Sequence, residues 1–252
     1  MEFLYEIYNM ASANGFIDFK ENFPTELEKN LKYPLRAYQK EALGRYLYYK
    51  EDTKNRLSPE HVLFNMATGS GKTLLLASLI LEKYQQGERN FIFFVNNENI
   101  LTKTRDNFLT AGASKYLFAE KIVLNNQVIP VREVTDFSDS NPNAINIVFT
   151  TIQKLHQDLN TPRENRLSYE QFEDISVVLL ADEAHHLNAG LNAREKKDNT
   201  SWTSTIENIQ KTAKKSSLLE FTATIDLNNK DIAQKYEKHL LYKYDLKEFR
   251  RD

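Results

Sequence analysis

The stretch VVLLADEAHHLNAG, residues 177–190, raises the question on which both fold and function depend. Its apolar run Val177–Leu180 is typical of a strand buried in a sheet. Four polar side chains follow the run almost at once: Asp182, Glu183, His185 and His186. These groups suit either a metal site with histidine and carboxylate ligands or a nucleotide-hydrolysing site whose other half lies upstream.

The composition is that of an ordinary soluble globular protein with one large domain or two small ones. The chain has 252 residues, a formal net charge of −2 and no cysteine. This charge neither requires nor excludes a nucleic-acid partner, because a local basic stripe can lie on a chain without net positive charge. The lack of cysteine excludes disulfides, thiolate nucleophiles and cysteine-based zinc sites.

The N-terminal sequence MEFLYEIYNMASANGF lacks the basic and then apolar pattern of a signal peptide. No apolar run approaches the length of a membrane span. We therefore expect a cytoplasmic protein without a membrane partner.

Strands and helices are predicted to alternate along the chain. The predicted strands cover 61–66, 91–96, 145–151, 176–182 and 217–224. The predicted helices cover 34–50, 72–86, 98–110, 152–159 and 203–214. Near-continuous apolar strands, each followed by a helix, are typical of a parallel sheet covered on both faces, so we predict an α/β fold.

Two other segments have weaker patterns. Residues 112–143 predict short strands around KIVLNN and PVREV, followed by a loop. The tail, KYEKHLLYKYDLKEFRRD, alternates apolar and charged residues and contains no closing element that the pattern identifies.

The segment MATGSGKT, residues 66–73, joins a predicted strand to a long apolar helix. A loop that binds phosphate needs inward-facing backbone N–H groups and residues that tolerate positive φ, which Gly69 and Gly71 supply. Lys72 would then reach the β- and γ-phosphates, and the Thr73 hydroxyl would ligate Mg²⁺. The helix start adds its positive dipole end. The predicted nucleotide cradle comprises Ala67, Thr68, Gly69, Ser70, Gly71, Lys72 and Thr73.

The usual phosphate-loop pattern G-x-x-x-x-G-K-[ST] is incomplete, because Met66 occupies its first glycine position. The alternative is a glycine turn that precedes Lys-Thr by chance. Kinases, GTPases and motor ATPases share this cradle, so the segment alone does not identify the enzyme.

A phosphate loop needs an acid at the end of a neighbouring strand to hold the Mg²⁺ shell. Asp182 follows a predicted strand at the carboxyl edge of the sheet, where open α/β folds bind ligands. We predict that Asp182 holds Mg²⁺ through water, that Glu183 is the general base, and that Lys72 assists catalysis. The metal-site alternative is less favoured, because His185 and His186 are adjacent, whereas zinc hydrolases use histidines one helical turn apart.

Together these segments resemble the motor domains of helicase superfamily 2, the DEAD/DEAH-like proteins. MATGSGKT resembles motif I, DEAHH (182–186) resembles motif II and FTAT (221–224) resembles motif III. LRAYQKEA (35–42) resembles the Gln motif, FFVNNENILTKTRDNF (93–108) resembles motif Ia, and FTTIQKL (149–155) resembles the next motif that faces nucleic acid. Within the superfamily the chain looks most like the restriction subunit of type III restriction–modification enzymes, with type I restriction motors as the nearest competitor.

The resemblance implies a RecA-like first motor domain that binds and hydrolyses ATP with Mg²⁺. It implies that Gln39, with Arg36 in the same motif, reads the adenine edge. It also implies that His185, Thr222 and Thr224 couple the nucleotide site to the nucleic-acid track.

Polar groups after the second and third predicted strands are candidates for contacts to nucleic-acid phosphates, which position a protein without reading bases. The alternative for each is an ordinary helix cap or a solvated helix start. The candidates are Asn97, Asn99, Thr102, Lys103, Thr104, Thr151 and Gln153.

The resemblance further implies three parts: an N-terminal helical segment with the Gln motif (1–60), packed on a RecA-like ATP-binding domain (61–228), and the start of a connection (229–252) to a second RecA-like domain of a longer chain. That second domain would supply arginines, whose absence slows turnover by roughly 10³–10⁵. The isolated chain is therefore expected to be weakly active. The implied partners are duplex DNA and a methyltransferase subunit. A nucleotide-dependent DNA-binding module without turnover and a small-molecule kinase remain as alternatives.

Overall fold

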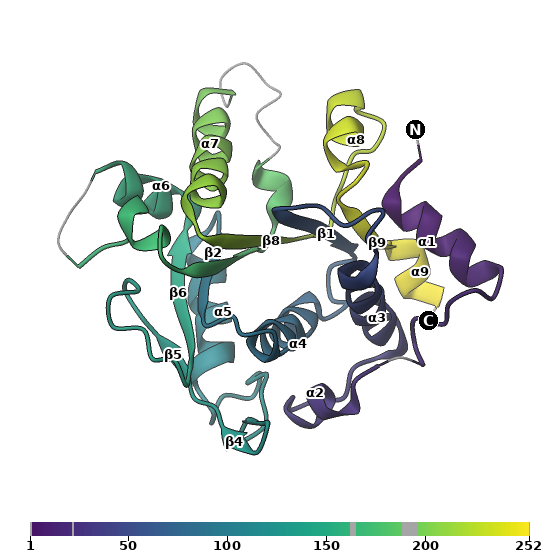
Figure 1. Ribbon diagram of the computed structural model, residues 1–252. Coiled ribbons are helices and arrows are strands. Elements are labelled where there is room, and N and C mark those ends of the chain that lie inside the picture. The colour runs from purple at the N-terminus through teal and green to yellow at the C-terminus, as the bar shows by residue number, and fades with distance from the viewer. Residues whose placement is uncertain (1, 22, 162–164, 188–195, 252) are drawn as a thin grey trace.

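Seven parallel strands form one sheet in the computed structural model, which describes residues 2–21, 23–161, 165–187 and 196–251. The strand order is β5-β6-β2-β7-β8-β1-β9 (Figure 1). The strands are β1 (Glu60–Met66), β2 (Asn90–Val95), β5 (Val131–Glu133), β6 (Ile145–Thr151), β7 (Ser176–Ala181), β8 (Lys215–Thr222) and β9 (Leu240–Tyr244). Each neighbouring pair is parallel, as the sequence predicts.

Helices cover both faces of the sheet (Figure 1). One layer contains α3 (Ala37–Glu51), α4 (Lys72–Gln85) and α5 (Glu98–Leu109); the opposite layer contains α6 (Ile152–Asn160), α7 (Lys196–Thr212) and α8 (Lys230–Tyr236). Short 3₁₀ helices, η1 (Tyr169–Phe172) and η2 (Ala184–Leu187), flank β7. The predicted α/β class is confirmed, because the parallel sheet lies between two helical layers.

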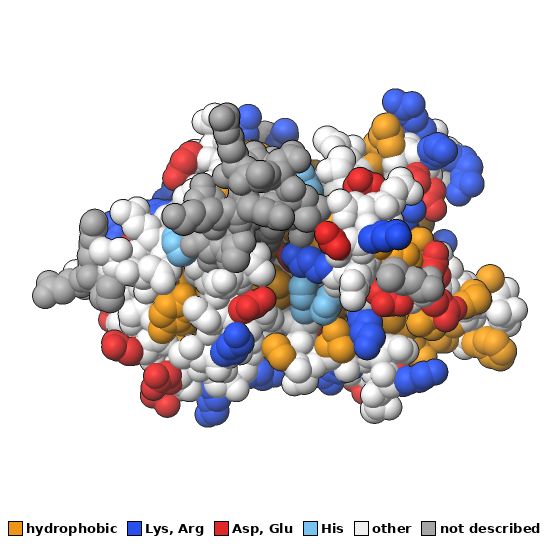
Figure 2. All heavy atoms as spheres, turned by 90° about the horizontal axis from the view of Figure 1, so that it is seen from above, with side chains coloured by type: hydrophobic (Ala, Val, Ile, Leu, Met, Phe, Trp, Pro, Cys, Tyr) orange, Lys and Arg blue, Asp and Glu red, His pale blue; other side chains and the backbone are white. Residues whose placement is uncertain are grey.

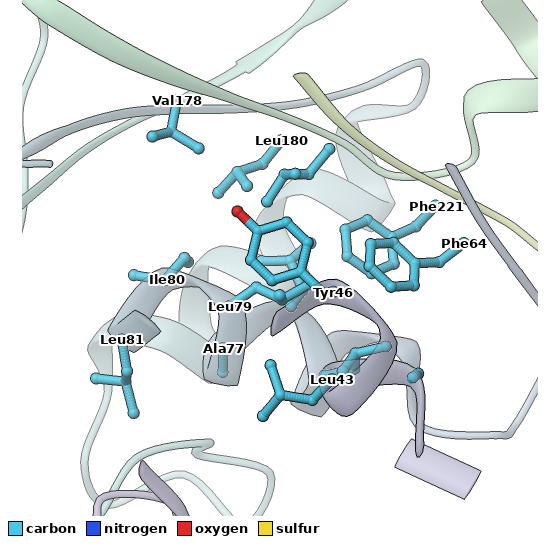
Figure 3. Packing of buried hydrophobic residues seen from close by; sticks show 14 of the residues in the cluster. Leu43, Tyr46, Phe64, Ala77, Leu79, Ile80, Leu81, Val178, Leu180 and Phe221 are labelled. Atoms are coloured by element: carbon cyan, nitrogen blue, oxygen red, sulfur yellow. The ribbon is translucent and has the colours of Figure 1, made fainter. Parts of the chain in front are cut away.

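Strand side chains alternate between the two layers, as the pleat of a β-strand requires. In β2, Phe91 and Phe93 join the core under α3 and α4, whereas Ile92 and Phe94 join the core under α6 and α7. Figure 3 shows the first of these cores, in which the ring of Phe64 stacks on Phe221 with 5.1 Å between centroids. Burial on both faces explains why these strands are almost continuously apolar in sequence.

The tyrosines of α3 contribute to the core unequally. Tyr46 and Tyr49 are 0% exposed, whereas Tyr48 is 38% exposed. Three tyrosines so closely spaced cannot share one helix face, because side chains three or four positions apart share a face and adjacent ones do not. Tyr46 and Tyr49 therefore pack in the core, and the Tyr48 ring lies at the exposed edge of the helix.

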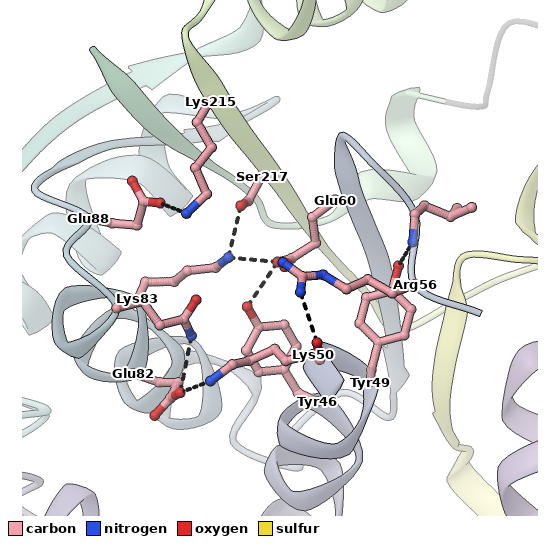
Figure 4. A network of polar contacts seen from close by, with 12 residues as sticks. Tyr46, Tyr49, Lys50, Arg56, Glu60, Glu82, Lys83, Glu88, Lys215 and Ser217 are labelled. Carbon is pink, nitrogen blue, oxygen red and sulfur yellow. Dashed lines mark hydrogen bonds and ion pairs between the residues drawn. The ribbon is translucent and has the colours of Figure 1, made fainter. Parts of the chain in front are cut away.

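A buried polar network joins α3, α4, β1 and β8 at the amino edge of the sheet (Figure 4). The Lys83 ammonium lies 2.7 Å from a carboxylate oxygen of Glu60 and donates to Ser217 Oγ at 2.8 Å. Tyr46 Oη donates to the same oxygen of Glu60 at 2.9 Å. Burial lowers the pKa of Lys83, while the adjacent Glu60 opposes this shift. The ion pair is therefore part of the core and not of the surface.

The tail, for which the sequence pattern identifies no closing element, forms β9 and α9 (Leu246–Arg251). Strand β9 pairs with β1 and extends the sheet that residues 61–228 build. Helix α9 begins with a capping box: Asp245 Oδ1 accepts from the N–H of Lys247 at 2.8 Å, and Glu248 Oε2 accepts from the N–H of Asp245 at 2.8 Å. The N–H groups of Glu248 and Lys247, which donate to the Asp245 carboxylate, hold the pKa of Asp245 below its ordinary value.

The N-terminal segment forms α1 (Leu4–Ala13) and α2 (Thr25–Lys29) ahead of α3. Helix α1 lies beside β9, and the N–H of Leu4 donates to the carbonyl of Glu237 at 2.9 Å (Figure 1). The chain therefore meets its own tail at this end of the sheet. The division at residues 60 and 228 stays a prediction.

Residues 112–143 contain the short strands that the sequence predicts there. β3 (Val123–Leu124) and β4 (Gln127–Val128) form a hairpin, while β5 joins the main sheet. The turn residues Asn125 and Asn126 have φ values of 51° and 60°, which asparagine tolerates better than most residues.

Candidate nucleotide-binding site

The residues 67–71 form a tight loop between the carboxyl end of β1 and the start of α4. Gly69 and Gly71 have φ values of +83° and +79°, in the left-handed region that glycine adopts without strain. Gly71 is the residue before the first turn of α4, so the helix N-terminus opens toward the loop. The predicted strand–loop–helix arrangement is present.

Two polar groups of this loop region are poorly satisfied by the protein. Lys72 Nζ has long contacts to the carbonyls of Met66 at 3.3 Å and Ala67 at 3.5 Å. Ser70 Oγ is buried and has no hydrogen-bond partner among the described residues. A buried hydroxyl without a partner is costly, and phosphate oxygens would satisfy both groups. The loop therefore fits a polyphosphate.

The N-terminus of α3 lies against the outside of the loop. Gln39 Nε2 donates to the carbonyls of Ser70 and Gly71, each at 3.0 Å, and Gln39 Oε1 accepts from the N–H of Arg36 at 2.8 Å. A Cβ at Gly71 would lie 2.6 Å from Gln39 Nε2, so another residue there would strain the backbone at a φ of +79° and displace the end of the Gln39 side chain. Gln39 thus holds the phosphate loop; adenine reading by Gln39 stays a prediction.

Asp182 and Glu183 follow β7, the strand next but one to β1 in the sheet. Burial, with a smaller contribution from the Glu183 charge, raises the pKa of Asp182 to about 6, and the nearby Lys72 ammonium opposes the shift. The N–H of Glu183 donates to Asp182 Oδ1 at 3.0 Å, and Glu183 has a φ of 55°. A carboxylate in so unfavourable a position is suited to a divalent cation, which would replace the missing solvation.

The predicted coupling residues connect the ends of β7 and β8. His185 Nδ1 lies 3.2 Å from Glu183 Oε2 and 3.1 Å from Thr222 Oγ1. Thr222 Oγ1 donates its proton to the carbonyl of Thr224 at 2.8 Å, so His185 Nδ1 is the donor in its contact with Thr222. The neighbouring His186 side chain lies outside the described residues.

The candidate nucleic-acid contacts lie at the same edge of the sheet, after β2 and β6. Asn97 and Thr151 cap α5 and α6: Asn97 Oδ1 accepts from the N–H of Asn99 at 2.8 Å, and Thr151 Oγ1 accepts from the N–H of Lys154 at 3.3 Å. Gln153 Nε2 donates to Asn96 Oδ1 and joins the two strand ends. Thr102 and Lys103 are exposed, whereas Thr104 is buried. Caps and exposed side chains both permit phosphate contacts, which stay predictions.

The molecular surface carries no large area of one charge on the side drawn in Figure 2, where basic and acidic side chains are interspersed. Hydrophobic side chains gather at the right-hand end, where α1 lies in Figure 1. In the described part of the chain, no helix has both the length and the apolar character to cross a membrane.

Sequence reasoning missed three aromatic residues that contact the loop or its supports. Tyr38 lies inside the Gln motif, and its hydroxyl donates to the carbonyl of Ser70 at 3.0 Å. Tyr244 and Phe249 come from the tail and pack against Tyr38. Tyr38 could have been identified from its place between Arg36 and Gln39 in the Gln motif. Nothing in the sequence pattern of the tail indicates a role for Tyr244 or Phe249.

The chain is similar to known proteins both in sequence and in structure. The family model described as "Type III restriction enzyme, res subunit" matches residues 32–227. The "Probable type III restriction-modification enzyme HindVIP Res subunit" of Haemophilus influenzae is 40% identical over 255 residues, which cover 90% of this chain and 49% of that protein. The chain thus spans about half the length of this curated relative.

Among solved structures, the Sulfolobus solfataricus SWI2/SNF2 ATPase core in complex with dsDNA has 17% identity and a TM-score of 0.49, covering 81% of this chain and 35% of that one. The UvsW helicase of bacteriophage T4 has 18% identity and a TM-score of 0.48, covering 95% of this chain and 76% of that one.

Proposed function

The chain belongs to the family of type III restriction enzyme Res subunits, and from this premise we propose that it is the ATP-binding and ATP-hydrolysing first motor domain of a DNA translocase. The family supports the general assignment, and the geometry of the sheet edge supports the chemistry. The proposal extends to duplex DNA as the track, to a second RecA-like domain that completes the ATP site, and to a methyltransferase subunit as partner.

One observation carries the chemical part: the glycine loop with Lys72 and the partly buried acid Asp182 both lie at the carboxyl edge of one parallel sheet. The charge of Lys72 acts to lower the pKa of Asp182 against the effect of burial, which supports an interaction between the two groups. A cation on a phosphate loop beside an acid on a nearby strand is the arrangement that nucleoside triphosphate hydrolysis needs.

Each residue then has a defined part. Lys72 and the loop N–H groups would bind the β- and γ-phosphates, while Thr73 and Asp182 would hold Mg²⁺, Asp182 through water. Bound Mg²⁺ offsets charge on the phosphate oxygens. Glu183 Oε2 accepts a proton from the attacking water, and His185 orients this carboxylate at 3.2 Å. His185 also contacts Thr222, which links hydrolysis to the adjoining strand end.

The test is ATP binding and hydrolysis by this chain, with and without duplex DNA, in the wild type and two variants. Lys72→Ala should abolish ATP binding, because it removes the cation of the cradle. Glu183→Gln should keep ATP binding and lower turnover at least about 100-fold, the usual contribution of a general base. ATP binding with no turnover above background in either the wild type or Glu183→Gln would instead favour a binding module without hydrolysis of its own. Binding unchanged in Lys72→Ala would refute the proposed site.

A further inference from the structure

The outer side of the phosphate loop is held by hydrogen bonds to two successive carbonyls. The Ser70 carbonyl accepts from Tyr38 Oη and from Gln39 Nε2, both at 3.0 Å. The Gly71 carbonyl accepts from Gln39 Nε2, also at 3.0 Å. The loop is therefore anchored through its backbone, on the side where Tyr38 and Gln39 lie.

These anchors determine where the loop N–H groups point. In a trans peptide the C=O and the following N–H lie in one plane and point in opposite directions. With the Ser70 carbonyl drawn outward, the N–H of Gly71 points to the inner side of the loop. The Gly71 carbonyl, which accepts from the N–H groups of Leu74 and Leu75 in the first turn of α4 as well as from Gln39, does the same for the N–H of Lys72. These two N–H groups belong to the cradle that would bind phosphate.

We infer that Tyr38 is a positioning residue for this cradle: its hydroxyl, together with Gln39, fixes the two peptide units whose N–H groups bind the nucleotide phosphates. The inference rests on the proposed function, since it assigns a role in that same site. Arg36 Nη1 donates to Tyr38 Oη at 3.1 Å, so the single hydroxyl proton is directed to the Ser70 carbonyl.

The tail of the chain holds the Tyr38 ring in place. Tyr38 stacks on Tyr244 with 4.3 Å between centroids and an interplanar angle of 17°, and the ring of Phe249 meets Tyr38 edge-on at 6.4 Å. The carbonyl of Tyr244 accepts from the N–H of Ala67 at 2.9 Å. Phe249 also borders the loop directly, 3.9 Å from where a Cβ of Gly69 would lie. Thus β9 and α9 support the loop from outside.

A positioning role differs from a merely structural one in what it affects. If the Tyr38 hydroxyl orients phosphate-binding N–H groups, its removal weakens binding of any polyphosphate, with or without adenosine. If the hydroxyl only stabilises the fold, its removal lowers the melting temperature and leaves affinity unchanged.

The experiment displaces a fluorescent ATP analogue from the wild type and from Tyr38→Phe, with Mg²⁺ present, using ATP and inorganic tripolyphosphate as competitors. Tyr38→Phe keeps the ring and its stacking and loses one hydrogen bond, so both competitors should bind about three- to tenfold more weakly. The matched control is Tyr48→Phe, the same change on α3 at a half-exposed ring away from the loop, which should bind both competitors as the wild type does.

Unchanged ATP affinity in Tyr38→Phe, or a loss confined to ATP and not shared by tripolyphosphate, would overturn the inference. Phe249→Leu provides a second variant: it keeps an apolar group on the loop while removing the edge-on ring, and a smaller loss for both competitors should result. Lys72→Ala separates this question from the proposed function, because loss of binding in that variant verifies the site even where Tyr38→Phe has no effect.

Discussion

His239 is an imidazole that folding keeps neutral. It precedes β9, stacks on His61 with 4.0 Å between ring centroids, and approaches the His61 carbonyl with Nδ1 at 3.1 Å. Burial, with a contribution from the neighbouring His61, lowers the pKa of His239 from 6.5 to about 4. The uncharged form therefore belongs to the folded state.

The free energy of unfolding should fall as pH is lowered from about 6.5 toward 4. In this range His239 binds a proton in the unfolded chain but stays neutral in the folded chain. The contribution is fully present above pH 6.5 and is lost by about pH 4, with a size on the order of 3 kcal/mol. Denaturant unfolding across this range should show the loss in the wild type and a shallower slope in His239→Gln. Equal slopes in the two proteins would contradict the assignment.

The positions of individual residues of the candidate nucleotide site were predictable where a motif places them on one continuous segment. Lys72 and Thr73 follow two glycines, and Asp182 ends an apolar run, so spacing alone was sufficient. Tyr38 was not identified, because its importance depends on a contact to the Ser70 carbonyl across a fold that the sequence does not describe.

At the scale of elements, the interface between α4 and the sheet depends on a buried charge pair. Lys83 is 1% exposed, and its charge is balanced by Glu60 of β1 at 2.7 Å. Such a pair contributes little net stability, but either partner alone is a buried charge without compensation.

Lys83→Met should destabilise the protein by about 3–5 kcal/mol, because it leaves the Glu60 carboxylate buried and unpaired. Adding Glu60→Gln removes that charge and keeps an acceptor for Tyr46, so the double variant should recover much of the loss. Urea unfolding at pH 7 measures both.

The matched control is Lys211→Met, which breaks the exposed pair of Lys211 with Glu207 at 3.9 Å and should change stability by less than about 1 kcal/mol. A double variant as unstable as Lys83→Met would show that the destabilisation comes from lost packing and not from the unpaired Glu60 carboxylate.

The elements themselves were predictable where hydrophobic periodicity is strong. The five predicted strands are β1, β2, β6, β7 and β8, each buried on both faces. The strand β9 was missed, because its sequence LLYKY is short and lies among charged residues. Helix α9 depends on the Asp245–Glu248 capping box, a local signal that can be read only once the helix start is known.

The whole molecule brings its site together from segments far apart in the chain. Along the carboxyl edge the order β6-β2-β7-β8-β1 places Thr151, Asn97, Asp182, Thr222 and the phosphate loop in succession. Parallel strands made this convergence predictable, since their carboxyl ends share one edge. The strand order was not predictable, because it depends on pairings between distant segments.

Binding of Mg²⁺ and ATP should stabilise the whole molecule, because the ligand binds the folded loop and not the unfolded chain. At ATP concentrations 100 times the dissociation constant the gain is about 2.7 kcal/mol. For a domain of this size the melting temperature should rise by roughly 5–10 °C, as measured by calorimetry. Lys72→Ala should show no such rise at the same concentration, and a rise equal to that of the wild type would contradict the proposed site.

The position of β1 within the sheet has a consequence for protein synthesis. Among the described strands, β1 pairs with β8 and β9, residues 215–222 and 240–244, and not with any strand that directly follows it. A ribosome adding roughly 5–20 residues per second leaves β1 without partners for on the order of ten seconds. During that interval an apolar strand has two open edges, which is the condition that chaperones recognise and that favours aggregation. The loop at residues 67–71, although encoded early, is thus among the last parts of this sheet to acquire its native form.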